Sequence, residues 1–158
     1  MTQRPYKILL VEDNPGDVRL VRECLRCEDI RYEMTHCENV EAAFRMLSGY
    51  GGDDPKIPDL LLLDYNLPGG DAREVIHAAV ANPALCGTRK AVLTSSFSPR
   101  DRQDALQAGA ECFILKPADL DLFLNEVGSA VLRLLCQESS PLNPKRTSVG
   151  LPPNLKPC

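Results

Sequence analysis

The stretch Lys7-Ile-Leu-Leu-Val11 is apolar after its lysine, and Glu12-Asp13-Asn14-Pro15 follows it directly. A strand that is buried on both faces carries continuous rather than alternating apolar residues. Asn14 can cap a helix. Pro15 suits the first helical position, because the N–H that proline lacks would have no intrahelical partner there. The stretch therefore predicts a buried strand, an acidic turn and a helix that reaches about Cys27.

The same alternation of a short apolar run with an amphipathic stretch continues along the chain. Further strands are predicted at residues 32–37, 59–64, 91–94 and 112–115. Helices that begin at a capping residue are predicted at residues 39–47, 71–81, 98–109 and 119–136. Five β-α units in strict alternation predict an α/β fold, with one parallel sheet, helices on both faces and right-handed crossovers.

Composition and charge narrow the class of protein. The chain has 158 residues, with 44% hydrophobic and 25% charged residues and a formal net charge of -4. Nothing offers the basic field that nucleic acid or an anionic membrane attracts. No signal peptide or long apolar run is evident, so we expect a cytoplasmic protein. We expect one domain at residues 1–136 and a proline-rich extension without its own core at residues 137–158.

The seven cysteines are odd in number and irregularly spaced, which argues against a disulfide framework in a reducing compartment. Cys24 and Cys27 form a C-x-x-C pair near a predicted helix end. One pair cannot complete a tetrahedral zinc site, and a redox pair belongs at a helix start. We interpret both as small, partly buried helix residues.

Polar side chains stand at the ends of four of the predicted strands. They are Glu12 and Asp13, then Asp64 and Asn66, then Thr94, Ser95 and Ser96, and finally Lys116 with Pro117. In an open parallel sheet, chemistry collects at the carboxyl ends of the strands. We therefore expect these residues to meet at one rim.

Each of these residues has an ordinary explanation when it is taken alone. Glu12 and Asp13 could be acids favoured by the dipole at a helix start, and Asp64 could be a turn residue. Thr94 could be an ordinary strand residue, and Lys116 a solvated loop lysine. Together they are better explained by chemistry. Carboxylates held close together repel one another, and a divalent cation such as Mg²⁺ relieves that repulsion. One carboxylate can then attack phosphorus, while a lysine and a hydroxyl stabilise the phosphoryl oxygens.

Four segments carry a family resemblance. They are Leu9-Leu-Val-Glu-Asp-Asn14, Leu62-Leu-Asp-Tyr-Asn-Leu-Pro68, Leu93-Thr-Ser-Ser96 and Leu115-Lys-Pro117. Over about residues 6–136 the chain resembles the receiver domain of two-component response regulators, of the single-domain, CheY-like kind. The resemblance implies a flavodoxin-like doubly wound (βα)5 fold with strand order 2-1-3-4-5.

The resemblance also implies roles for the rim residues. Asp64 would accept a phosphoryl group from a sensor histidine kinase as an acyl phosphate. Asp13 and Asp64 would bind Mg²⁺ or Mn²⁺, together with Glu12 through water and the backbone carbonyl of Asn66. Lys116 would pair with the phosphoryl oxygens, and the bond between Lys116 and Pro117 would be cis.

The remaining implied roles concern switching. Thr94 would bond the phosphoryl group and move with its loop. Phe113 stands at the aromatic switch position and, without a hydroxyl, would signal by packing alone. Asn66 and Ser96 would tune the phosphoryl lifetime.

The chain departs from the family at Ala72, where a glycine is usual and where a positive φ would cost alanine about 1 kcal/mol. The loop at residues 48–58 is also longer than in the chemotaxis receiver. That loop, the Glu-Asp-Asn-Pro opening and the Asp-Tyr-Asn-Leu-Pro segment resemble single-domain regulators paired with bacteriophytochrome kinases. This implies a bacteriophytochrome as the partner kinase.

No output domain is expected in the proline-rich extension, so output must pass through protein contacts. A homodimer through helix 119–136 and the extension is one hypothesis. An apolar stripe on that helix is expected to face the core, and it comprises Leu120, Phe123, Leu124, Val127, Val131, Leu134 and Leu135. Leu122, Leu132 and Cys136 are expected toward solvent.

Three alternatives stay open at this point. A phosphorelay shuttle would share the same site. A haloacid-dehalogenase-like Mg²⁺-dependent phosphatase also uses an Asp after an apolar strand, but it needs an Asp where Asn66 stands. A flavodoxin-like FMN binder would find its phosphate repelled by the carboxylates.

Overall fold

The computed structural model describes residues 4–137, so most of the predicted 137–158 extension lies outside the described residues. The elements alternate as the sequence predicts. Their order is β1 (Tyr6–Val11), α1 (Pro15–Cys27), β2 (Tyr32–Cys37), α2 (Val40–Gly49), β3 (Leu60–Leu63), α3 (Ala72–Ala81), η1 (Pro83–Leu85), β4 (Arg89–Thr94), α4 (Pro99–Ala108), β5 (Cys112–Leu115), α5 (Leu120–Leu122), η2 (Phe123–Val127) and α6 (Gly128–Cys136).

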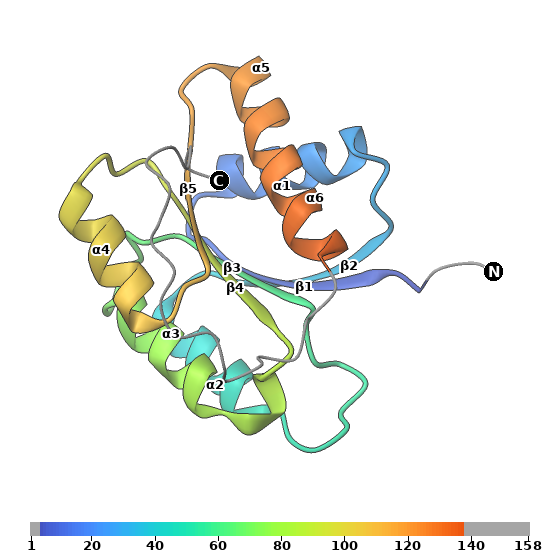
Figure 1. Cartoon of the computed structure of the whole chain (residues 1–158), viewed down its shortest axis with the longest axis vertical. Coiled ribbons are helices and arrows are strands. Elements are labelled where there is room, and N and C mark those ends of the chain that lie inside the picture. The colour runs from blue at the N-terminus through green and yellow to red at the C-terminus, as the bar shows by residue number, and fades with distance from the viewer. Residues whose placement is uncertain (1–3, 138–158) are drawn as a thin grey trace, which may run out of the picture.

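The five strands form one parallel sheet in the order β2-β1-β3-β4-β5, which confirms the flavodoxin-like topology (Figure 1). The pairing register places the carboxyl ends of neighbouring strands close to one another. Val11 pairs with Leu63, Leu63 pairs with Val92, and Thr94 pairs with Leu115. The residues that follow these strands therefore come to one edge of the sheet.

Helices cover both faces of the sheet, with α2, α3 and α4 on one face and α1 with the C-terminal helix on the other (Figure 1). In β3, Leu61 and Leu63 pack into the hydrophobic core on the face covered by α2, α3 and α4. Leu60 and Leu62 pack into the core on the opposite face, under α1 and the C-terminal helix. Each is at most 1% exposed, and burial of a leucine contributes roughly 1.5–3 kcal/mol. This double burial explains the continuous apolar run.

The predicted capping residues stand at the helix starts. Side chains of Asn14, Asn39, Asp71, Ser98 and Asp119 accept hydrogen bonds from backbone N–H groups of the first turns. Gly109 ends α4 in a left-handed conformation with φ 116°, as expected of a glycine at this position.

Ala72 is buried as the first residue of α3, so its helical backbone carries no strain. The positive φ in this loop falls on Gly69, at 80°. Gly69 therefore takes the conformation that an alanine would resist.

The C-terminal helix differs from its prediction as one regular helix. The segment Phe123–Val127 is π-helical, and its extra residue per turn rotates the residues before it relative to those after it. Leu120, expected on the buried stripe, is 55% exposed. Leu132, expected in solvent, packs partly against the core.

Cys24 is buried, and its thiol donates to the carbonyl of Phe123 at 3.7 Å. Burial raises the pKa of Cys24 to about 12. Cys27 is exposed at the last residue of α1. A thiol with so high a pKa is inert, so the structural interpretation agrees with the geometry of Cys24, whereas Cys27 is exposed rather than partly buried.

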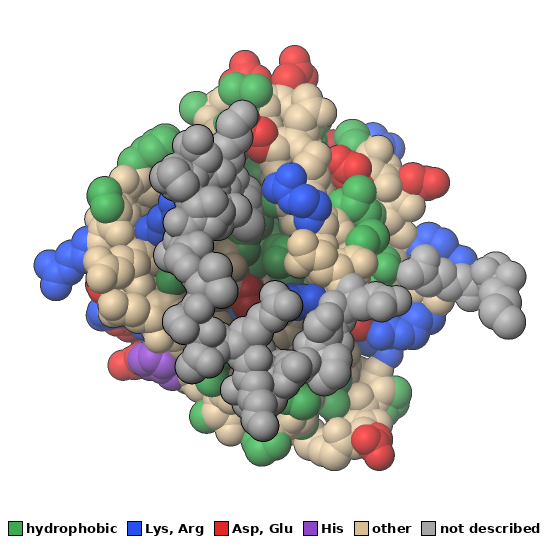
Figure 2. Space-filling view, viewed as in Figure 1, with side chains coloured by type: hydrophobic (Ala, Val, Ile, Leu, Met, Phe, Trp, Pro, Cys, Tyr) green, Lys and Arg blue, Asp and Glu red, His purple; other side chains and the backbone are tan. Residues whose placement is uncertain are grey.

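On the face in Figure 2, basic, acidic and apolar side chains are interspersed rather than gathered by charge. Across residues 4–137, no helix is long and apolar enough to cross a membrane.

Candidate functional site

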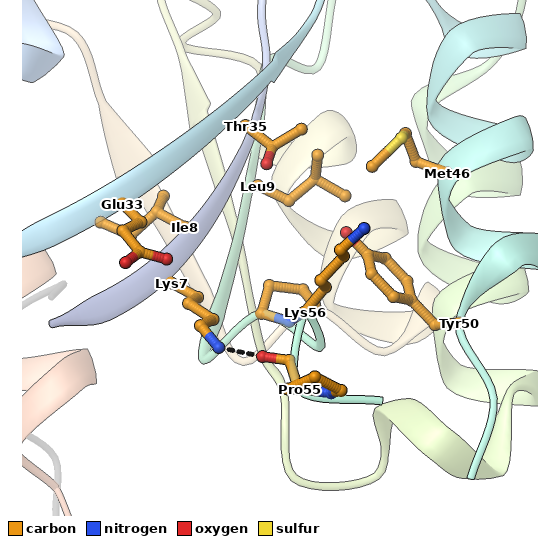
Figure 3. A pocket seen from close by; sticks show the side chains of 10 residues that line it. Lys7, Ile8, Leu9, Glu33, Thr35, Met46, Tyr50, Pro55 and Lys56 are labelled. Carbon is orange, nitrogen blue, oxygen red and sulfur yellow. Dashed lines mark hydrogen bonds between the residues drawn. The ribbon is translucent and has the colours of Figure 1, made fainter. Parts of the chain in front are cut away.

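The molecule offers a cavity and a charged cluster at opposite ends of the sheet. The cavity, of about 230 Å³, lies between the amino ends of β1 and β2, the end of α2 and the loop before β3 (Figure 3). Its polar groups include Lys7, whose ammonium donates to the carbonyl of Pro55. It brings together no carboxylate cluster, whereas the carboxyl end of the sheet does.

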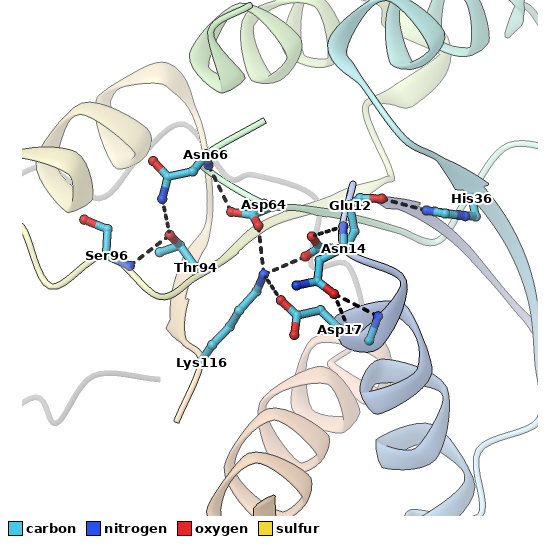
Figure 4. Close-up of polar contacts among 10 residues, drawn as sticks. Glu12, Asn14, Asp17, His36, Asp64, Asn66, Thr94, Ser96 and Lys116 are labelled. Carbon is cyan, nitrogen blue, oxygen red and sulfur yellow. Dashed lines mark hydrogen bonds and ion pairs between the residues drawn. The ribbon is translucent and has the colours of Figure 1, made fainter. Parts of the chain in front are cut away.

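Three strand-end residues meet at that carboxyl end (Figure 4). The Nζ atom of Lys116 lies 2.6 Å from Oε2 of Glu12 and 2.8 Å from Oδ2 of Asp64. Glu12, Asp64 and Lys116 are 1%, 8% and 9% exposed. Buried charges are tolerated only when they are paired. The pairing of these three side chains therefore explains how the fold can bury them.

Asp17 completes the cluster, and the sequence analysis missed it. Its Oδ2 lies 2.8 Å from the Lys116 Nζ. Oxygen atoms of Glu12, Asp17 and Asp64 all lie within 4.8 Å of one another, whereas Asp13 is exposed and stands outside this group. Asp17 lies four residues before buried Val21 on α1, so the helical period could have placed it beside the rim.

The electrostatics of the cluster favour a charged lysine. Burial opposes the charge on Lys116, but the hydrogen bonds that its ammonium donates to Asp17, Asp64 and Glu12 outweigh burial and raise its pKa. Burial raises the pKa of Glu12, against the hydrogen bonds that Lys116 and the Asn14 N–H donate to it. Three carboxylates facing one ammonium make the cluster attractive to a cation.

The donor set suits a hard divalent cation. Glu12, Asp17 and Asp64 offer only carboxylate oxygens, and such oxygens are the ligands that Mg²⁺ and Mn²⁺ take. Glu12 and Asp64 are buried and close enough to share one ion. The residues at this rim therefore fit a divalent metal.

Thr94, Asn66 and Ser96 lie beside Asp64, as the sequence predicts for one rim. The Asn66 N–H donates to Asp64 Oδ1 at 2.9 Å, and Asn66 Nδ2 donates to Thr94 Oγ1 at 3.4 Å. The Ser96 N–H donates to Thr94 Oγ1 at 3.1 Å, and its hydroxyl contacts Asp101. These bonds link the loops after β3 and β4 around Asp64.

Phe113 is buried on β5, and its ring meets that of Tyr65 edge-on, with centroids 6.2 Å apart. The two rings connect β5 to the residue after Asp64. The expectation of a cis bond before Pro117 is wrong, because no peptide bond within residues 4–137 is cis. The trans form is the intrinsically favoured one, and Lys116 makes all three ion pairs with it.

His36 is a second residue that the sequence analysis missed. Its Nε2 lies 2.7 Å from the backbone carbonyl oxygen of Glu12. A carbonyl only accepts hydrogen bonds, so the Nε2–H must donate. His36 on β2 thereby holds the main chain at the end of β1.

Comparison with known proteins agrees with this geometry. The family model described as response regulator receiver domain matches residues 8–128. The chain therefore belongs to this family, the receiver domain of two-component response regulators. The family is one of signalling domains, not of catalytic proteins, so the phosphatase alternative is set aside.

Two relatives show which response regulators the chain is similar to in sequence. Response regulator Rcp1 of Synechocystis is 37% identical over 121 residues, which cover 75% of this chain and 82% of Rcp1. The transcriptional regulatory protein TrcR of Mycobacterium tuberculosis is 31% identical and matches 87% of this chain but only 48% of TrcR. The chain thus matches most of the length of Rcp1 but only about half of the length of TrcR.

Two solved structures are also similar. The phosphorylated cyanobacterial phytochrome response regulator RcpA has a TM-score of 0.75 and 31% identity, with coverage of 84% of this chain and 96% of RcpA. The Mn²⁺-bound form of Rcp1 has a TM-score of 0.74 and 33% identity, with coverage of 87% and 99%. The chain is therefore close to phytochrome response regulators in both sequence and fold.

Proposed function

We propose that Asp64 accepts a phosphoryl group from a sensor histidine kinase and that the chain switches its surface contacts in response. The observation that carries the proposal is the buried Lys116 ammonium, 2.8 Å from Asp64 and 2.6 Å from Glu12. The ammonium is a fixed positive charge beside Asp64, the strand-end carboxylate that Asn66 and Thr94 flank. Phosphoryl transfer depends mainly on such positioning and charge stabilisation.

In the proposed step, an Oδ atom of Asp64 forms a bond to phosphorus as the phosphorus–nitrogen bond of the phosphohistidine breaks. The nitrogen keeps the electron pair, and Asp64 becomes an acyl phosphate. Lys116 donates to the phosphoryl oxygens. Asp13, Asp64, Glu12 through water and the Asn66 carbonyl would hold Mg²⁺ or Mn²⁺, which neutralises phosphoryl charge when bound.

The switch would follow from Thr94 and Phe113. A phosphoryl group on Asp64 would offer the Thr94 hydroxyl a charged acceptor, so the loop after β4 would move toward it. Thr94 is fully buried and Phe113 packs on Tyr65 nearby, so this movement would repack the ring. Asn66 and Ser96 flank the phosphoryl position, where they would tune access of water.

The phytochrome relatives support a bacteriophytochrome as the kinase, and we keep the cytoplasmic location as part of this proposal. We also propose a homodimer through helix 119–136, where Leu120 and Leu122 are 55% and 50% exposed. The extension that would add to this contact lies outside the described residues. Leu122→Glu spares the buried face of the helix, so it should give a monomer by light scattering; an unchanged dimer mass would contradict this contact.

The acceptor role is tested by Asp64→Asn, which keeps the side-chain shape but removes the nucleophile. With acetyl phosphate and Mg²⁺, the wild-type chain should gain one phosphoryl group by mass spectrometry, and the variant should gain none. Asp59→Asn, at the other end of the same strand, is the matched control and should label normally. Undiminished labelling of Asp64→Asn, or phosphate mapped to another residue, would remove Asp64 as the acceptor.

A further inference from the structure

The Lys116 ammonium has three N–H donors, and three different elements supply its three acceptors. Glu12 follows β1, Asp17 belongs to the first turn of α1, and Asp64 follows β3, at 2.6, 2.8 and 2.8 Å from Nζ. Every donor of the ammonium is therefore engaged. Asp17 is the member of this set that has no part in the proposed transfer.

We propose that Asp17 is a positioning residue that holds the Lys116 ammonium over Asp64 while the phosphoryl group arrives. The inference rests on the proposed function. A lysine side chain has a flexible four-carbon stem and loses conformational freedom when it is fixed. If Asp64 alone held it, the ammonium would lose its anchor at the moment that phosphoryl oxygens replace the Asp64 oxygen.

Asp17 provides an anchor that this exchange does not disturb. When the N–H that now reaches Asp64 turns to a phosphoryl oxygen, the N–H groups on Asp17 and Glu12 can stay in place. Glu12 also belongs to the proposed set of metal ligands, through water, whereas Asp17 does not belong to that set and can keep its bond to the lysine. The ammonium thus starts the transfer already aimed at the acceptor.

The position of Asp17 is itself fixed by its helix. The Asn14 side chain accepts from the N–H groups of Gly16 and Asp17, at 2.8 and 3.4 Å, and Pro15 begins the helix. The Asp17 side chain is 26% exposed, against 1% for Glu12. Its replacement therefore leaves no buried void, and the start of the helix does not depend on its carboxylate.

Asp17 could instead matter only as an acid in a first helical turn, where a negative charge favours any helix. Glu74 is the matched control, because it is an exposed acid in the first turn of α3. Its replacement by glutamine removes the same helix-dipole charge without touching Lys116. Both positions must be compared at saturating Mg²⁺, so that a change in metal affinity does not alter the result.

The experiment titrates the full chain with beryllofluoride, a phosphoryl mimic, by calorimetry at saturating Mg²⁺. Asp17→Ala should weaken beryllofluoride binding about tenfold, and Asp17→Asn, which keeps an acceptor oxygen without the charge, by about threefold. Asp17→Glu should recover most of the affinity, and Glu74→Gln should match the wild type. With acetyl phosphate, Asp17→Ala should lower the maximal labelling rate more than it changes the half-saturating concentration.

Two results would overturn the inference. Tighter beryllofluoride binding by Asp17→Ala would mean that Asp17 competes with the phosphoryl oxygens for the lysine. Unchanged binding together with lower unfolding stability would mean a purely structural ion pair. A wild-type chain that binds no beryllofluoride would instead contradict the proposed function, so the two failures are distinguishable.

Discussion

Two lysines lie buried at opposite ends of the same sheet, and they show how differently one side chain can be used. Lys90 and Lys116 are 7% and 9% exposed. Lys90 donates to the carbonyl oxygens of Leu85 and Thr88, at 3.0 and 2.6 Å. Lys116 donates to three carboxylates. The first is held by neutral backbone and the second by charge.

The pKa directions follow from these partners. Burial lowers the pKa of Lys90, with only partial opposition from the charge of Glu111. The pKa of Lys116 is raised, because its carboxylates outweigh burial. A charged Lys90 therefore costs stability at neutral pH. The stability that a charged Lys116 adds is fully present below its unfolded pKa of about 10.4 and is lost as the pH rises through its higher folded pKa. Burial alone does not identify a functional lysine; an excess of opposite charge around it does.

The largest expected effect comes from removing the lysine that carboxylates surround. Lys116→Met leaves Glu12 and Asp64 buried without their cation, so the free energy of unfolding should fall by about 2–4 kcal/mol in EDTA. Added Mg²⁺ should restore part of this loss, because the freed carboxylates bind it more tightly. Urea unfolding followed by circular dichroism measures both effects.

Lys90→Met is the control for that experiment. It leaves two backbone carbonyls short of a donor, so it should cost about 1–2 kcal/mol, and Mg²⁺ should restore none of it. A Mg²⁺ response of equal size in both variants would mean that the ion acts elsewhere, and it would erase the distinction between the two ends of the sheet.

The comparison also explains what the sequence could predict. Continuous apolar runs such as Leu60–Leu63 marked the strands, because both faces of the sheet are buried. Residues directly after the strands were placed at one rim, since parallel strands bring their carboxyl ends together. The strand order itself came from the family resemblance, because the residue pattern alone is compatible with other orders.

The sequence is less informative where a feature depends on side-chain direction. Glu12 turns inward and its neighbour Asp13 lies exposed, as adjacent residues at a strand end do. Asp17 and His36 reach the site from the first turn of α1 and from the paired strand β2, where His36 is level with Leu10. Neither stands directly after a strand of the rim, so the rule that site residues follow strand ends does not predict them. Nor does apolar periodicity mark the π-helical segment at Phe123–Val127, because it assumes a regular helix.

The smallest expected effect belongs to an ion pair at the amino end, between Arg4 and Asp59, whose side chains are 65% and 24% exposed. Burial raises the pKa of Asp59, but the hydrogen bonds from Arg4 and the Lys7 N–H outweigh it, so the net pKa is lowered. Because an exposed partner weakens the pair, Asp59→Asn should cost about 0.5–1 kcal/mol at pH 7 and less at high salt.

The pH dependence of the free energy of unfolding shows whether the pair of Arg4 and Asp59 stabilises the fold. A carboxyl whose folded pKa is lowered stabilises the fold above its unfolded pKa of about 3.9, and that contribution is lost as the pH falls through the folded pKa. The stability difference between wild type and Asp59→Asn should therefore be constant near neutrality, begin to fall near about pH 4 and vanish once the pH is below the lowered folded pKa. Urea titrations at a series of pH values measure it. A difference that grows in acid would mean that burial raises the pKa of Asp59 more than Arg4 lowers it, and would contradict a stabilising ion pair at the amino end.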